Sequence, residues 1–210
     1  MSVVPLRQHK IIFLNGPPHS GKDTVANYVT SRLPHVRHRK FSAPLKAAAR
    51  AMFGVDDKLW QWLEGVGNNA NKDVRHDQLL GKTWREVLIV LSEQHMKPIY
   101  GKEVFGELLL LRLKEQTIAP FTIISDSGFG YEAFPILRHY GFKNCAVWRL
   151  HRPQYTFDKD SRGYWGSADV LDHNQLMDER DIDNQHELDM FKAQINYHIK
   201  RFTGIDLKEV

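Results

Sequence analysis

Short apolar runs alternate with helical patterns along this chain of 210 residues. Three of the runs indicate buried strands: residues 11–14 ("IIFL"), 121–125 ("FTIIS") and 145–150 ("CAVWRL"). They are almost continuously apolar, which is typical of parallel strands covered on both faces. Because strands and helices alternate, we expect an α/β fold with a mostly parallel sheet, flanked by helices and joined by right-handed crossovers.

The helical patterns carry recognisable starts and stops. The first follows the loop after residue 14 and ends at Pro34. In "FSAPLKAAARAMFG" we expect a second helix, with Ser42 as its N-cap and Gly54 after its last turn. Thr83-x-x-Glu86 is a capping-box pattern that opens a third. Further helices are expected at about residues 103–115, 131–139 and 187–202, the last of them capped by Asn184.

The chain suits a single domain over residues 1–210, with no internal repeat or low-complexity linker. Residues 55–82 hold glycines, asparagines and charges of both signs, and we expect them to form an acceptor-binding excursion over the site. Residues 151–167 are polar and contain glycine hinges, which favours a mobile lid.

The amino-acid composition gives only weak evidence about the ligands and partners of the protein. The net charge of +4 and a pI near 9.1 suit an anionic ligand. Cys145 is the only cysteine, which excludes an internal disulfide and fits a reducing cytoplasm; we expect it to be a small apolar group in a strand. No apolar run approaches the roughly 18 residues of a membrane span, so we expect no membrane contact.

The stretch "NGPPHSGKDTVANYV" contains the start of a phosphate-binding loop, Gly16-x-x-x-x-Gly21-Lys22. It follows a predicted strand and opens a predicted helix, as the mechanism requires. In such loops the glycines, together with residues such as Ser20, let backbone N–H groups converge on phosphate oxygens at a helix N-terminus. Lys22 would bridge the β- and γ-phosphates of ATP. The competing interpretation is an ordinary glycine turn before a helix.

Two acidic residues are candidate magnesium ligands. Asp23 stands where such loops normally carry a Ser or Thr that ligates Mg²⁺. Thr24 follows one residue late, and we expect its hydroxyl still to face the phosphates of ATP. The Asp23 carboxylate either holds the metal or points away and orients neighbouring groups. Asp126 follows the strand at residues 121–125, at the edge where open α/β sheets bind ligands, and we expect it to be catalytic and to bind Mg²⁺. The alternative interpretation is that Asp126 only caps the end of the strand.

Phosphoryl transfer needs positive charge around the moving group more than covalent chemistry. The segment "RLHRPQYTFDKDSRGYW" offers four cations that could supply this charge, namely Arg149, Arg152, Lys159 and Arg162. Arg152 lies just past the predicted strand and is our first choice as the catalytic arginine. The competing interpretation is a solvated charged loop.

With these parts the chain resembles the bacteriophage deoxynucleoside monophosphate kinases, a branch of the P-loop nucleotide kinases. The most specific match is "SGKDTVA" (residues 20–26), where the aspartate is itself a mark of the family. Weaker matches are "FSAPLK" (41–46), "GKTWREVL" (81–88), "ISDSGFGYEA" (124–133), "HRP" (151–153) and "DIDN" (181–184). Together they span nearly the whole chain.

The resemblance implies transfer of the ATP γ-phosphate to a deoxynucleoside 5′-monophosphate in the cytoplasm of a phage-infected bacterium. It implies ATP and Mg²⁺ as cofactors, and a small-molecule nucleotide as partner. Lys46, Arg85 and Glu132 would then bind the acceptor, and Asn184 would lie near the adenine. The sequence leaves open whether the chain forms a homodimer.

Two positions depart from the family pattern. Gly128 stands where the family commonly has an arginine, and residues 92–94 read Ser-Glu-Gln instead of Gly-Thr-acid. A phosphate clamp is therefore missing at the first position, which favours an acceptor other than a free monophosphate.

The main alternative is a kinase that phosphorylates 5-hydroxymethyluracil within phage DNA. Such an enzyme needs a basic rim and aromatic side chains that stack on bases. The candidates for these roles are residues 36–40 ("VRHRK"), Trp60, Trp62, Lys72, Arg75, Trp84, Tyr164 and Trp165. Trp60 and Trp62 also fit ordinary packing. A nucleotide-binding switch without transfer chemistry is a third hypothesis, less favoured because no Asn-Lys-x-Asp motif is present.

Overall fold

The computed structural model describes residues 9–65, 67, 69–115, 119–158, 160–170, 177–185 and 187–207. The chain divides into two compact units, each described by itself. The first comprises Met1–Phe41 and Gly106–Val210, and the second comprises Ser42–Phe105. The second unit includes the predicted excursion at residues 55–82 and extends beyond it at both ends. That the whole chain forms one domain stays a prediction.

A five-stranded sheet forms the centre of the first unit, and each neighbouring pair of strands is parallel. The strand order is β2-β5-β1-β6-β7. This confirms the predicted α/β class with its mostly parallel sheet. The strands are β1 (Lys10–Asn15), β2 (Arg37–Arg39), β5 (Phe121–Ile124), β6 (Cys145–His151) and β7 (Asp178–Asp183).

The three central strands are the ones that the apolar runs predict, whereas the two edge strands carry no such signal. Strand β2 reads Arg-His-Arg, and in β7 only Ile182 is buried. An edge strand needs little apolar surface and often carries charges, so its sequence does not stand out from a polar loop. Cys145 is fully buried in β6, as expected, and burial raises the pKa of its thiol.

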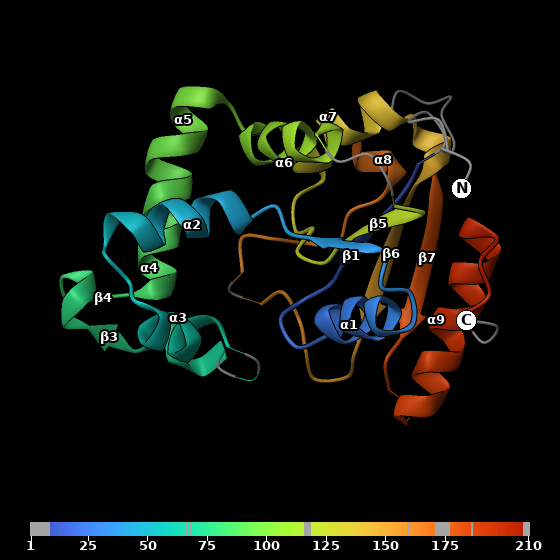
Figure 1. The fold of residues 1–210 in the computed structure, drawn as a ribbon, viewed down its shortest axis with the longest axis horizontal. Helices are drawn as coiled ribbons and strands as arrows, with labels where there is room; N and C mark the ends of the chain where they lie inside the picture. Colours follow the sequence, from blue (N-terminus) through green and yellow to red (C-terminus); the bar gives the residue numbers. More distant parts are fainter. Residues whose placement is uncertain are drawn as a thin grey trace. The chain divides into compact units, whose positions relative to one another are not determined.

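Helices cover both faces of this sheet, α1 and α9 on one side and α6 and α7 on the other (Figure 1). Ile12 and Leu14 of β1 join a core cluster with Val29 of α1 and Phe191 of α9. Alternate residues of β1 point to the opposite face. The helical segments are α1 (Lys22–Arg32), α6 (Val104–Lys114), α7 (Gly130–Tyr140), the 3₁₀ turn η5 (Phe142–Asn144), α8 (Ser167–Val170) and α9 (Leu188–Thr203).

The second unit is mainly helical and has its own core, in which Leu63, Leu79 and Trp84 are fully buried. Thr83 and Glu86 form the predicted capping box. The helical segments are α2 (Ala43–Met52), α3 (Asp57–Glu64), η2 (Asn69–Asp73), η3 (Asp77–Leu79), α4 (Trp84–Ile89), the π-helical turn η4 (Val90–Met96) and α5 (Lys97–Tyr100), and a short antiparallel pair is formed by β3 (Arg75–His76) and β4 (Lys82–Thr83).

Two predicted helix caps differ from the structure. Ser42 stands at the N-cap of α2, but its side chain makes no capping hydrogen bond because its backbone is already helical. Helix α9 begins at Leu188 with Glu187 at the N-cap, so the prediction that Asn184 caps it was wrong. Within the residues described, no helix is both long enough and apolar enough to span a membrane.

Candidate phosphate-binding site

The loop between β1 and α1 folds tightly, and its two glycines are required by space. A Cβ on Gly16 would lie 2.6 Å from Ser20 Oγ and 2.8 Å from the Leu150 carbonyl oxygen. Gly21 has φ of +105°, and a Cβ there would lie 2.6 Å from the Asn184 side-chain nitrogen. A side chain at either position would therefore open the loop.

Lys22 begins α1 and turns its ammonium back over this loop. Its Nζ donates to the carbonyl oxygens of Gly16 and Pro17, both at 2.6 Å, and lies 3.4 Å from Ser20 Oγ. Burial, followed by the nearby charge of Arg162, lowers the pKa of Lys22 to about 8. The ammonium is thus held at the centre of the loop in a partly desolvated place, where an anion would stabilise its charged form.

Asp23 points toward β2 and the end of β5. Its Oδ1 forms a 2.8 Å ion pair with Lys40 and accepts a 3.0 Å hydrogen bond from Ser125, whose Oγ lies 2.6 Å from His38 Nε2. Burial acts to raise the pKa of Asp23, but Lys40 and Ser125 outweigh it and keep this pKa below its usual value. These contacts favour the second expected role, orientation of neighbouring groups. Magnesium ligation by Asp23 stays a prediction, and Thr24 is exposed on α1.

Asp126 lies two residues beyond β5, in the same charged cluster as Lys22. Its Oδ1 accepts a 2.7 Å hydrogen bond from the Phe41 backbone N–H. Its charge raises the pKa of Lys22, against the larger lowering by burial. The sheet therefore brings Lys22 and Asp126 together although 104 positions separate them in sequence (126 − 22).

The structure separates the candidate cations of the lid segment. Arg152 Nη1 donates to the His19 carbonyl oxygen at 3.0 Å, and its guanidinium lies over the Tyr155 ring. Arg149 pairs with Asp181 and Glu179 of the neighbouring strand β7. These ion pairs raise the pKa of Arg149, and they hold its side chain against the neighbouring strand. Lys159 lies outside the described residues.

Arg162 is the lid arginine whose charge acts on the phosphate loop. It lowers the pKa of Lys22, and its own pKa is raised first by Asp160 and then also by Asp126 and Glu132. The sequence favours Arg152 because it directly follows the strand. The contact between Arg162 and Gly128 depends on how the later segment folds back, for which the sequence carries no local signal.

Glu132 and Asn184 are both in the first unit, in different surroundings. Glu132 lies in the first turn of α7, is buried, and acts electrostatically on Arg162. Asn184 follows β7, and its Nδ2 donates to the Ser20 carbonyl oxygen at 2.9 Å. Asn184 therefore supports the loop itself, and the predicted proximity to adenine stays a prediction.

Lys46 and Arg85 belong to the second unit, where each already has an acidic partner. Lys46 pairs at 2.8 Å with the largely buried Glu64. Arg85 reaches the two carboxylate oxygens of Asp73 through Nε at 2.7 Å and Nη2 at 3.2 Å. Their acceptor-binding roles stay predictions that rest on the resemblance.

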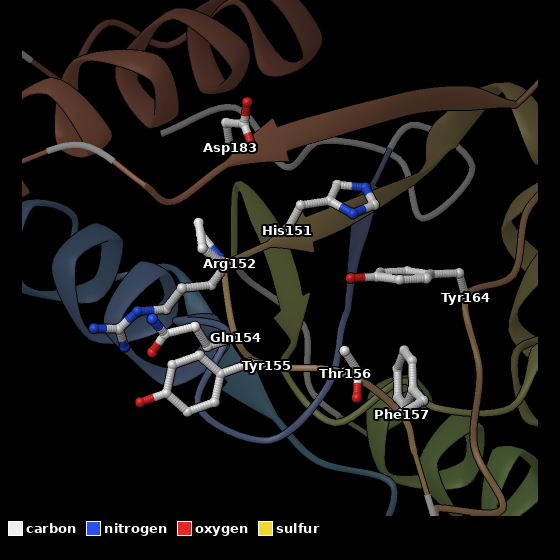
Figure 2. Close-up of a pocket in the computed structure, with 9 residues that line it drawn as sticks. His151, Arg152, Gln154, Tyr155, Thr156, Phe157, Tyr164 and Asp183 are labelled. Atoms are coloured by element: carbon white, nitrogen blue, oxygen red, sulfur yellow. The ribbon is translucent and has the colours of Figure 1, made fainter.

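A cavity of about 520 Å³ lies at the carboxyl ends of β6 and β7, in the first unit (Figure 2). The rings of His151 and Tyr164 lie 4.6 Å apart, and Phe157 meets Tyr164 edge-on. The sequence does not predict this cavity, although the aromatic residues of the lid segment are a signal for it. The residues that line the cavity are His151, Arg152, Pro153, Gln154, Tyr155, Thr156, Phe157, Tyr164 and Asp183.

The described residues contain no group of three or more His, Cys, Asp or Glu side chains able to hold a metal ion. Mg²⁺ usually takes only one or two carboxylates besides waters and substrate phosphates, so its binding needs no such group. With Asp23 paired to Lys40, Asp126 is the better placed of the two predicted carboxylate ligands.

Neither a protein-family profile nor a curated protein matches this chain in sequence. In structure it is similar to a gluconokinase from Sinorhizobium meliloti 1021, with a TM-score of 0.45, 12% identity and 94% of both chains covered. It is also similar to TT1252 from Thermus thermophilus (0.45, 17%, 94% of this chain and 100% of the other). A sugar kinase from Janibacter sp. HTCC2649 gives 0.41, 12%, and 94% and 95% coverage. Overlaps of this size carry no argument about activity, which must come from the site itself.

Proposed function

We propose that the protein is an ATP-dependent P-loop kinase that transfers the γ-phosphate to a deoxynucleoside 5′-monophosphate. The observation that carries this proposal is the position of Lys22, whose ammonium is held by two carbonyl oxygens of a glycine-bounded loop at the N-terminus of α1. In such a loop, triphosphate oxygens replace these carbonyls as partners of the lysine.

The cavity beside His151 fits the nucleobase end of ATP. It adjoins the phosphate loop through Arg152, which donates to His19 of that loop. Its walls combine the aromatic rings of Tyr155, Phe157 and Tyr164 with polar groups, the usual composition of a site for a flat heterocycle.

During transfer, an acceptor oxygen forms a bond to the γ-phosphorus while the bond from that phosphorus to the bridging oxygen of ADP breaks. Lys22 stabilises the charge on the β- and γ-phosphate oxygens. Asp126 would hold Mg²⁺, which would supply further positive charge for the phosphate groups. A monophosphate acceptor attacks through an oxygen that is already ionised, so the reaction needs no general base.

The surroundings of two tryptophans support a free monophosphate over a base in DNA. Trp84 and Trp165 are buried, and Trp165 donates through Nε1 to Ser127. The DNA hypothesis expects exposed aromatic rings that stack on a base, and neither of these tryptophans provides one.

DNA containing 5-hydroxymethyluracil stays a second candidate because some of its predicted contacts are exposed. Trp62 is 37% exposed, with its ring 6.3 Å from that of His76, and the Arg75 side chain is 66% exposed. A hydroxymethyl acceptor carries a proton that must leave as the new bond forms, so this reaction would require a carboxylate base.

The deciding experiment offers ATP labelled in the γ-phosphate to the protein with each acceptor. We expect label in deoxynucleoside diphosphates, and label found only in acid-insoluble DNA would replace the first acceptor by the second. Release of labelled phosphate without a labelled acceptor would instead indicate a nucleotide-hydrolysing switch.

The control for this assay is Lys22→Ala. The substitution removes the ammonium that the structure places at the centre of the loop, so we expect transfer to either acceptor to be lost while circular dichroism shows an intact fold. If Lys22→Ala retained substantial activity, the assignment of the loop would be wrong.

A further inference from the structure

The segment that follows β6 brings Arg162 directly against the turn after Asp126. A Cβ on Gly128 would lie 2.3 Å from Arg162 Cδ and 2.7 Å from its Cγ. Carbon atoms in contact are about 3.5–4.0 Å apart, so a side chain at position 128 and the observed arginine exclude each other. The stem of Arg162 therefore fills the space that the glycine leaves.

The backbone around Arg162 is anchored to this wall. Asn15, fully buried at the end of β1, donates from Nδ2 to the carbonyl oxygens of Ser127 (2.7 Å) and Gly163 (2.9 Å). The Gly163 N–H donates to the Gly128 carbonyl oxygen at 3.3 Å. These bonds tie the residue after Arg162 to the strand that leads into the phosphate loop, so the arginine is presented by a fixed part of the segment.

The guanidinium of Arg162 is held at two points by Asp160. Nε donates to Oδ1 at 2.8 Å and Nη2 donates to Oδ2 at 2.5 Å. The two side chains are only 29% and 20% exposed. Two parallel N–H donors that meet two oxygens form the same fork that arginine uses for phosphate. A carboxylate thus occupies the position in which a phosphate oxygen pair would fit.

Arg162 and Lys22 share one charged neighbourhood. Arg162 lowers the pKa of Lys22, next in size to the effect of burial, while Asp126 and Asp160 act on Lys22 in the opposite direction. Two cations that act on each other in this way repel unless an anion lies between them. Here Asp126 and Asp160 supply part of that anionic charge.

We propose that Arg162 binds the γ-phosphate of the donor nucleotide beside Lys22, and that Asp160 occupies the arginine fork until the triphosphate displaces it. This inference rests on the proposed function, since it assumes that the loop binds ATP. Arg152 does not fit this role, because its guanidinium donates to the His19 carbonyl and lies over Tyr155 at the cavity.

The test compares nucleotides that do or do not carry the γ-phosphate. Calorimetry would measure Kd for magnesium-bound ADP and for a non-hydrolysable ATP analogue in three variants: Arg162→Lys, Asp160→Asn and Arg201→Lys. Arg162→Lys keeps the charge but loses the fork, and should weaken the triphosphate about tenfold to a hundredfold, the range for one charged hydrogen bond. ADP should change by less than about twofold on the same scale. Arg201, exposed in the last turn of α9, is the matched control and should change neither.

Asp160→Asn removes the competing charge, so we expect it to tighten triphosphate binding and leave ADP unchanged. Equal weakening of both nucleotides by Arg162→Lys, or no weakening of either, would overturn the placement of Arg162 at the γ-phosphate. Weaker triphosphate binding by Asp160→Asn would overturn the displacement by showing that Asp160 only positions the arginine. Failure of the unmodified protein to bind either nucleotide would instead overturn the proposed function.

Discussion

Binding of ATP should be accompanied by uptake of a proton at Lys22. In the free protein, burial and the charge of Arg162 lower the pKa of this lysine from 10.5 to about 8. The anionic phosphates favour the ammonium form and return its pKa toward or above the usual value. Phosphate monoesters have their second pKa near 6, so the nucleotide itself is fully ionised at pH 8 and above. In this pH range the net uptake of protons on binding therefore measures the protonation of Lys22.

The size of the effect follows from the pKa of the free protein. With a pKa of about 8, roughly half of the Lys22 side chains are neutral at pH 8, about one tenth at pH 7 and about nine tenths at pH 9. Each neutral lysine takes up one proton when ATP binds. By linkage, affinity should fall by about half a log unit per pH unit near pH 8 and by nearly one log unit per pH unit at pH 9.

Calorimetry in buffers of different ionisation enthalpy measures this uptake, because the buffer supplies the proton. At pH 8 the observed binding enthalpy should vary with buffer ionisation enthalpy with a slope of about 0.5. Lys22→Arg is the control, since arginine stays protonated throughout and should abolish the slope. A slope near zero in the unmodified protein at both pH 8 and pH 9 would refute the reasoning about Lys22.

Three further predictions concern packing, capping and the acceptor. Gly106→Ala should lower the free energy of unfolding by about 1–3 kcal/mol, measured by urea titration, because a Cβ there would lie 2.0 Å from the Glu132 carbonyl oxygen. Gly163→Ala, which meets open space, should be nearly neutral, and equal losses would contradict this packing argument. Thr83→Ala should cost about 1 kcal/mol through loss of the capping box, seen as a lower thermal midpoint; an unchanged midpoint would mean that the cap contributes nothing. Arg85→Ala should raise KM for the acceptor far more than KM for ATP in steady-state kinetics, and the reverse would assign Arg85 to the donor.

The features that depend on neighbouring residues could be predicted from the amino-acid sequence alone. The three central strands are read from continuous apolar runs, because strands covered on both faces exclude polar side chains. The phosphate loop is read from Gly16, Gly21 and Lys22, whose spacing is set by local backbone geometry. The capping box of Thr83 and Glu86 is local as well, and the structure confirms it.

The features that join residues far apart in the chain could be seen only once the chain was folded. The edge strands β2 and β7 exist because a neighbouring strand offers them partners, so their own polar sequences do not predict them. Asn184 supports the loop at Ser20 instead of capping α9, since the ends of β7 and β1 meet at one edge of the sheet. The pairing of Asp23 with Lys40 arises in the same way.

The arginines of the lid segment show why sequence order alone does not predict which charges act on the loop. Sequence order favours Arg152 because it is the first cation after β6, yet electrostatic effect depends on distance in space. Arg162 acts on Lys22 because Asn15 and Gly163 fold the segment back onto the turn at Gly128. Local patterns therefore locate the loop that we propose binds phosphate, whereas long-range hydrogen bonds select the charges that surround it.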